Sequence, residues 1–160
     1  MNYSFRFGIA CLSILFSGLV HATNVQVDNA WAKATLPGQS TGLVNLTLTS
    51  KPTATLIGAT SPACKSVELH SMTHDNGMMK MREVKAIKLP AGEPIDLEKA
   101  GFHLMLIGLK SALKEGENVP LTLHIKQANQ RVVKVKASAI IKPVMATPPT
   151  SKEDTHEHHH

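Results

Sequence analysis

Methionine and histidine gather in one part of this sequence, and together they could bind a soft metal ion. Five of the seven methionines fall within residues 72–105, and His70, His74 and His103 lie in or beside that stretch. Imidazole nitrogen and thioether sulfur form a neutral ligand set that suits Cu(I). Zn(II), Mg(II) and Ca(II) instead favour thiolate, carboxylate or carbonyl ligands. A thioether also needs no deprotonation and forms no disulfide in an oxidising compartment. The residue types therefore indicate Cu(I) chemistry.

The first group of these residues is predicted to lie on a β-hairpin. Asn76-Gly77 is the strongest short-range signal for a two-residue type I′ turn. Directly opposed side chains have Cβ atoms about 5 Å apart and diagonal ones about 7–8 Å, so one ion could touch both strands. Folding about this turn predicts the following pairs: Asp75 with Met78, His74 with Met79, Met72 with Met81, and His70 diagonally with Met81.

The second group lies on a separate predicted strand, Phe102–Leu109. Strand alternation sends Phe102, Leu104 and Leu106 to one face, and His103 and Met105 to the other. A strand buried on both faces could carry the same pattern, and the sequence alone leaves this alternative open.

Period-2 alternation dominates the remaining chain, and no segment has a convincing helical stripe over three turns. We therefore predict an all-β fold, a barrel or sandwich of about eight to ten short strands. The hairpin on either side of Gln127–Gln130 is the clearest, because Leu and Ile alternate with polar residues. The other expected strands are Asn24–Thr35, Thr41–Thr49, Thr53–Ala59, Lys65–Met72, Met78–Val84, Ala86–Leu89 and Pro94–Leu97.

The N-terminus is typical of an export signal. Arg6 precedes an apolar run, Ile9–Val20, which is shorter than the ~20 residues that span a bilayer. Cleavage after Ala22 would make residues 1–22 a signal peptide, and we expect a periplasmic chain with no membrane span after cleavage. Cys11 would leave with that peptide, and its early place in the apolar run does not favour a lipoprotein anchor. The remaining cysteine, Cys64, cannot form an internal disulfide.

Composition also divides the expected mature chain. Residues 23–142 form the predicted copper-binding β domain, and residues 143–160 are rich in Pro, Thr, Ser and charge, which is typical of a flexible tail. The tail ends in four histidines that could bind Cu(II): His156, His158, His159 and His160. They are either a native tail, which we favour because the signal peptide is intact, or the remnant of a purification tag.

Charge and motifs exclude several classes of function. The formal net charge of +5 is mild, the expected mature chain has no basic run, and its only aromatic residues are Trp31 and Phe102. A nucleic-acid-binding protein would need a basic stripe and stacking rings. The sequence also has no nucleophile elbow and no His-Glu-x-x-His motif, so we do not expect an enzyme of the hydrolytic classes.

Four of the histidines and methionines match the spacing of a known family. Ten residues separate His70 from Met81, twenty-one separate Met81 from His103, and Met105 follows at the next position but one. This spacing and the neighbouring segments Asp75-Asn76-Gly77 and Gly101-Phe102-His103 are similar to those of the PCu(A)C copper chaperones. The sequence resembles that family over roughly residues 24–142.

The resemblance implies a cupredoxin-like β-barrel that is not an enzyme and that binds one Cu(I) through His70, Met81, His103 and Met105. It also implies delivery of copper to the dinuclear site of cytochrome c oxidase subunit II, often with a Sco-type chaperone. Many members have a C-terminal His/Met extension that binds Cu(II). We expect a monomer. Met72 remains undecided between a spare ligand and a hydrophobic lid.

Several residues receive a simpler interpretation. Met79 and His74 are expected to be solvated hairpin residues, His124 a surface strand residue, and Cys64 a small buried residue. Met78 is assigned no role.

Three rival functions would use part of the same chemistry. A blue-copper electron carrier needs a Cys thiolate and two His ligands, and no histidine of the expected mature chain precedes Cys64. A histidine-brace monooxygenase would need cleavage just before His21, after the unfavourable Val20. A periplasmic copper buffer would have the same site as a chaperone, so the sequence does not separate storage from delivery.

Overall fold

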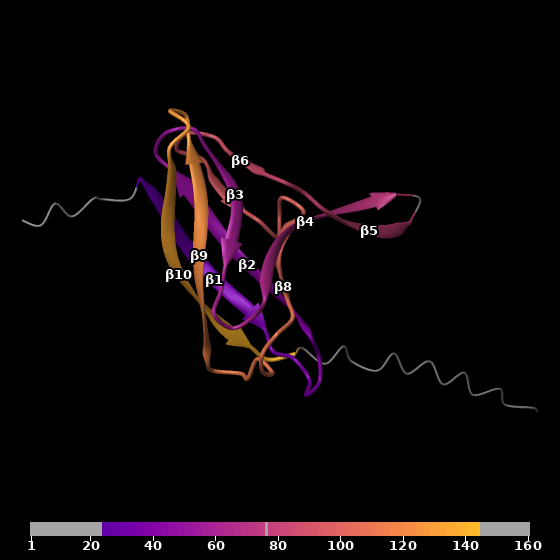
Figure 1. Ribbon diagram of the computed structural model, residues 1–160. Helices are drawn as coiled ribbons and strands as arrows, with labels where there is room; N and C mark the ends of the chain where they lie inside the picture. The colour runs from indigo at the N-terminus through magenta and orange to yellow at the C-terminus, as the bar shows by residue number, and fades with distance from the viewer. Residues whose placement is uncertain (1–23, 76, 145–160) are drawn as a thin grey trace, which may run out of the picture.

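The computed structural model describes residues 24–75 and 77–144, and these residues form ten strands with no helix (Figure 1). The all-β prediction is therefore confirmed. The predicted signal peptide and the tail histidines lie outside the described residues. No helix in the described ranges is long and apolar enough to cross a membrane. The strands are β1 (Val25–Lys33), β2 (Thr41–Ser50), β3 (Ala54–Thr60), β4 (Ser66–Asp75), β5 (Met78–Glu83), β6 (Ile87–Leu89), β7 (Pro94–Asp96), β8 (Phe102–Ile107), β9 (Asn118–Gln127) and β10 (Val132–Lys142).

Seven of these strands close into a barrel, in the order β4-β8-β2-β1-β10-β9-β3. The pair Ala59 and Val67 joins β3 back to β4 and completes the closure. Three short or peripheral strands remain outside this ring: β6 pairs with β3, β7 with β2, and β5 with β4. Closure leaves most strands with neighbours on both sides, which satisfies their backbone hydrogen bonds.

The barrel interior is aliphatic, as the alternation in the sequence predicts. On β9, Leu121, Leu123 and Ile125 are buried, and the residues between them are half-buried. On β8, Leu104 and Leu106 are completely buried and contribute to the same core. Burial of these side chains stabilises the barrel by roughly 1.5–3 kcal/mol each, and the core therefore holds β8 in a fixed orientation.

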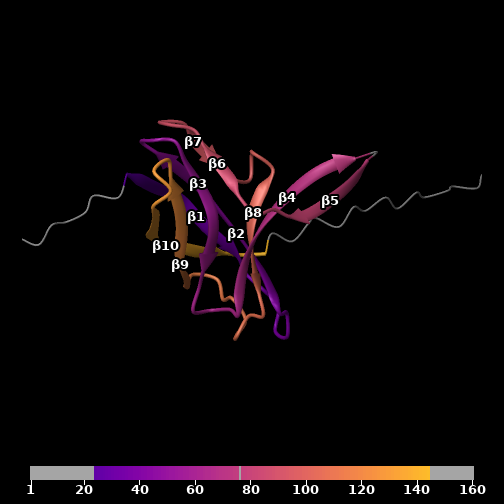
Figure 2. The same cartoon turned by 45° about the horizontal axis from the view of Figure 1, so that its top comes forward.

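The β4–β5 hairpin extends away from the barrel as a two-stranded ribbon (Figure 2). Its register agrees with the prediction, since Asp75 pairs with Met78 and Met72 with Met81. Gly77 has a φ of 77°, a left-handed conformation that favours glycine. β5 has only β4 as a sheet neighbour, so most of its side chains are exposed.

Candidate metal centre

Two histidines from different strands face each other where the hairpin joins the barrel. β4 and β8 run antiparallel, and their register pairs His70 with His103. The ring centroids lie 5.6 Å apart with an interplanar angle of 53°. His103 is only 1% exposed, and the His70 side chain is 14% exposed. The fold thus brings together the two imidazoles that the sequence singles out.

His103 has no hydrogen-bond partner on either ring nitrogen, although both nitrogens are buried. An unpaired polar atom inside a protein costs about 1–3 kcal/mol. Burial, and to a smaller extent the neighbouring His70, lower the pKa of His103 below its ordinary value. The ring is therefore held neutral, with one nitrogen lone pair available. A buried neutral imidazole without a partner fits a soft metal ion as its missing neighbour.

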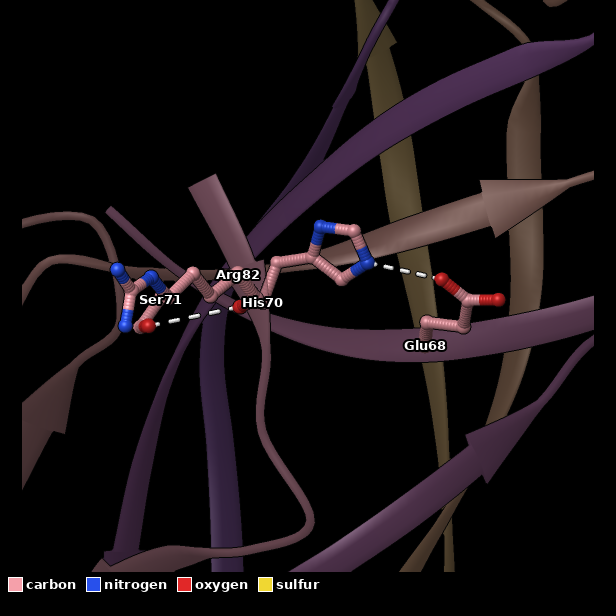
Figure 3. A network of polar contacts seen from close by, with 4 residues as sticks. All are labelled: Glu68, His70, Ser71 and Arg82. Atoms are coloured by element: carbon pink, nitrogen blue, oxygen red, sulfur yellow. Dashed lines mark hydrogen bonds and ion pairs between the residues drawn. The ribbon is translucent and has the colours of Figure 1, made fainter. Parts of the chain in front are cut away.

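His70 is held by a carboxylate. Its Nε2 lies 2.8 Å from Oε2 of Glu68, two residues earlier on the same strand (Figure 3). Since a carboxylate oxygen accepts hydrogen bonds, this contact assigns a proton to Nε2 and leaves a lone pair on Nδ1 of the neutral ring. That Nδ1 is buried without a partner. A histidine with one nitrogen on a carboxylate and the other free is a common arrangement for a metal ligand.

Two half-buried thioethers flank the histidine pair on the same sheet face. Met105 lies two residues beyond His103, and Met72 lies two residues beyond His70. In the antiparallel ladder each methionine is therefore diagonal to the histidine of the other strand, about 7–8 Å away between Cβ atoms. Met72 and His103 also line one small open pocket, together with Trp31 and Phe102.

Met81 is placed differently from the other three ligand candidates. It pairs with Met72 on the outer strand β5 and is 47% exposed. It is diagonal to His70, as predicted, but β4 lies between it and β8. Its flexible side chain must therefore extend over β4 to reach the same ion as His103.

Gly101 fixes the hairpin to β8 beside these groups. Its carbonyl accepts a 2.7 Å hydrogen bond from the Met72 amide. Its φ is 76°, and a Cβ atom there would lie 3.1 Å from the Met72 carbonyl oxygen. A side chain at position 101 would therefore strain the backbone next to the two histidines.

Sequence reasoning missed three residues beside the histidine pair. Glu68 could have been found, because a spacing of two places it on the same strand face as His70. Asn45 was a weaker signal: it is a polar residue in an apolar run, and it is buried with Oδ1 unpartnered. No sequence pattern pointed to Trp31. It lies near the histidine pair only because β1 and β2 pair Trp31 with Asn45.

Cys64 is 4% exposed, as predicted for a small buried residue, and its Sγ lies 3.2 Å from the Ser66 carbonyl oxygen. Burial raises the pKa of its thiol above the ordinary value, although a backbone hydrogen bond from Ile107 and the charge of Lys110 act in the opposite direction. The strand from Ser66 to His70 alone spans about 13 Å. A thiolate–imidazole centre of the blue-copper type therefore gains no support.

Comparison with known proteins adds independent findings. Residues 25–137 match the family described as "Putative lipoprotein LpqE-like". The protein named "Putative lipoprotein Lxx21020" from Leifsonia xyli subsp. xyli (strain CTCB07) is 36% identical over 115 residues, which cover 71% of this chain and 69% of that protein.

Solved structures agree on the fold. The solution structure of apo-DR1885 from Deinococcus radiodurans is 31% identical, with a TM-score of 0.56, over 91% of this chain and 95% of that one. The CuI-DR1885 structure is 32% identical, with a TM-score of 0.53, over 72% of this chain and 78% of that one. The copper-bound PCuAC domain of PmoF2, at 19% identity and a TM-score of 0.59 over 76% and 94% of the two chains, shows the same fold.

Proposed function

Because the chain belongs to the LpqE-like family and has the PCuAC fold, we propose that it is an exported copper chaperone that binds one Cu(I) at the His70–His103 pair. The observation that carries the proposal is the set of buried ring nitrogens without partners, Nδ1 of His70 and both nitrogens of His103. Three unpaired polar atoms in one place are costly for a small barrel. A bound ion would satisfy one nitrogen of each ring.

The proposed ligands are His70, His103, Met105 and Met81. The two histidines supply nitrogen from adjacent strands, and Met105 supplies sulfur from the same face of β8. Met81 completes the set from the exposed strand β5. Two nitrogens and two sulfurs without charge favour Cu(I) over harder divalent ions. CuI-DR1885, which is 32% identical to this chain, is a Cu(I) form of a related protein, and it supports this choice of ion.

The test is an anaerobic titration with Cu(I) against a chromophoric chelator, followed by X-ray absorption of the 1:1 complex. We expect one tightly held ion with about two nitrogen and two sulfur neighbours. A complex without sulfur neighbours, or no competition with the chelator, would overturn the assignment.

We further propose that the chain delivers this copper, with the dinuclear site of cytochrome c oxidase subunit II as acceptor and a Sco-type chaperone as helper. The site adjoins an open pocket and an exposed hairpin, so acceptor ligands can approach. Neutral thioethers also hold Cu(I) less strongly than the acceptor's thiolates would. Mixing the loaded protein with the reduced apo acceptor should move the metal. Copper that stays in place at equimolar acceptor would favour storage.

Export is proposed from residues 1–22, which lie outside the described residues. The relative from Leifsonia xyli is named a lipoprotein, which agrees with an exported family. The intact mass of the processed protein is the test. Cleavage after Ala22 is the expected result. A mass that corresponds to a lipid-modified chain beginning at Cys11 would instead indicate a protein anchored to the membrane.

A further inference from the structure

Three methionines of the β4–β5 hairpin form a group, and the proposed histidine site uses only one of them, Met81. Met79 is 61% exposed and Met81 is 47% exposed, both on β5. Met72 pairs with Met81 from β4 and is half-buried. The ribbon that carries them projects from the barrel (Figure 2), and solvent reaches the exposed side chains of Met79 and Met81.

The two faces of this ribbon have different chemistry. Strand alternation places Met79 and Met81 on the face of Met72 and His70. The opposite face has Met78, Lys80 and Arg82 from β5 with Ser71 and Thr73 from β4, and Lys80 there pairs with Asp75. Among the described hairpin residues, no Lys or Arg shares the thioether face. A cation approaching that face of the hairpin therefore meets sulfur and no Lys or Arg of the hairpin, and the adjoining pocket has Lys33 together with Glu98 in its lining.

The spacing lets the three sulfur atoms meet at one ion. Met72 and Met81 are directly opposed, about 5 Å apart between Cβ atoms, and Met79 is diagonal to Met72 at about 7–8 Å. Each methionine has three rotatable side-chain bonds and a polarizable sulfur. We propose that Met72, Met79 and Met81 form a second, outer Cu(I) site on the hairpin, which receives the ion from solvent or a donor before it reaches the histidine pair. Met81 belongs to both sites, so a second ion that binds while the inner site is filled is held by Met72 and Met79.

Transfer between the sites needs only ligand exchange. Met72 lines the pocket that contains His103, so it adjoins both sites. As the ion moves inward, Met81 stays bound, the Cu–S bonds to Met79 and Met72 break, and Cu–N bonds to His70 and His103 and a Cu–S bond to Met105 form in their place. The metal remains Cu(I), and no proton or electron is transferred, because thioethers and neutral imidazoles bind without deprotonation. The inner end of this path rests on the proposed function, whereas binding at the outer site does not.

An apolar surface for a partner protein is the rival explanation, because exposed methionine also serves flexible protein contacts. The two explanations predict different effects of replacing methionine with leucine. Leucine preserves the apolar area but has no sulfur, so a partner surface would tolerate it and a copper site would not.

Met79 and Met78 offer a matched pair of variants. They are neighbours in the chain with 61% and 63% exposure, and they lie on opposite faces of the ribbon. Met79→Leu and Met78→Leu should therefore fold equally well, and any copper held by the C-terminal histidines is common to both. The purified protein, labelled with ¹³C at the methionine methyl groups, is titrated anaerobically with Cu(I) to two equivalents.

The first equivalent should shift the Met105 methyl signal and the second the Met79 signal. Met79→Leu should weaken the second equivalent by at least the ~10–100-fold that loss of a supporting group costs at metal sites, and it should slow loading of the first. Met78→Leu should leave both unchanged. Equal behaviour of the two variants, or a Met79 signal that never moves, overturns the outer site. Failure of the proposed function is a separate result, in which Met105 does not shift while Met79 does.

Discussion

His70 and His103 face each other across the β4–β8 ladder with ring centroids 5.6 Å apart, yet only His70 has a hydrogen-bond partner. The partner, Glu68, orients one ring from its own strand, whereas packing alone positions the other. The two rings should therefore respond differently to mutation, since one depends on a polar contact and the other on the core.

His103→Leu is expected to abolish tight Cu(I) binding and to raise the stability of the copper-free protein. The substitution removes two buried nitrogens that have no partner in the described structure, each of which costs about 1–3 kcal/mol. Chelator competition and thermal unfolding of the apo protein measure the two effects. His124→Ala, a half-buried position on β9, is the control and should retain full affinity. A lower apo melting temperature for His103→Leu would mean that the ring nitrogens have partners after all.

Glu68→Ala should weaken Cu(I) binding about 10–100-fold without unfolding the barrel, because it frees the His70 ring that the carboxylate orients. Glu68→Gln should recover part of the loss, since its amide oxygen can still accept from Nε2. ¹⁵N NMR of the apo protein provides a second readout. The wild-type His70 ring is expected to carry its proton on Nε2, and a wild-type ring protonated on Nδ1 instead would contradict the assignment.

Met105→Leu and Met81→Leu should each remove one sulfur neighbour from the X-ray absorption spectrum of the 1:1 complex. Leucine conserves most of the apolar volume, so stability should change by less than about 1.5 kcal/mol. Met72→Leu decides the open question of that residue. If it removes a sulfur neighbour while Met81→Leu does not, the half-buried thioether next to His103 is the fourth ligand in place of the exposed one.

Deletion from Thr150 onward should abolish Cu(II) binding by His156, His158, His159 and His160 and leave the Cu(I) site intact. Clustered imidazoles bind Cu(II) readily, whereas the thioethers that favour Cu(I) are on the hairpin and β8. Electron paramagnetic resonance measures the Cu(II) site, and chelator competition measures Cu(I). Loss of Cu(I) binding on truncation would show that the two regions act together.

Cys64 should react slowly with an alkylating reagent in the native protein and quickly after unfolding. Burial raises the pKa of the thiol, so less reactive thiolate is present at any given pH, and the Sγ atom is also covered. Because the folded state favours the protonated thiol, this contribution to stability decreases as pH rises above the ordinary thiol pKa. Cys64→Ala should leave Cu(I) affinity unchanged. A lower Cu(I) affinity of Cys64→Ala would indicate that the Cys64 thiolate is a copper ligand.

Local sequence patterns determined the strands and the hairpin register. Alternation with period 2 depends only on which side chains face the core, and Asn76-Gly77 specifies a turn within a few residues, so the pairing of Met72 with Met81 follows from the sequence alone. The same alternation placed His103 and Met105 on one face of their strand, and the resemblance to the PCu(A)C family singled out the four ligand candidates.

Only the tertiary structure decided which strands became neighbours beyond the two predicted hairpins. The His70–His103 pair exists because β4 and β8, separated by the intervening chain, are brought side by side when the barrel closes around its aliphatic core. No local pattern encodes that adjacency, since long-range pairing depends on the packing of the whole core. For the same reason the burial of His103, and the presence of Asn45 and Trp31 beside it, could not be deduced from the residues alone.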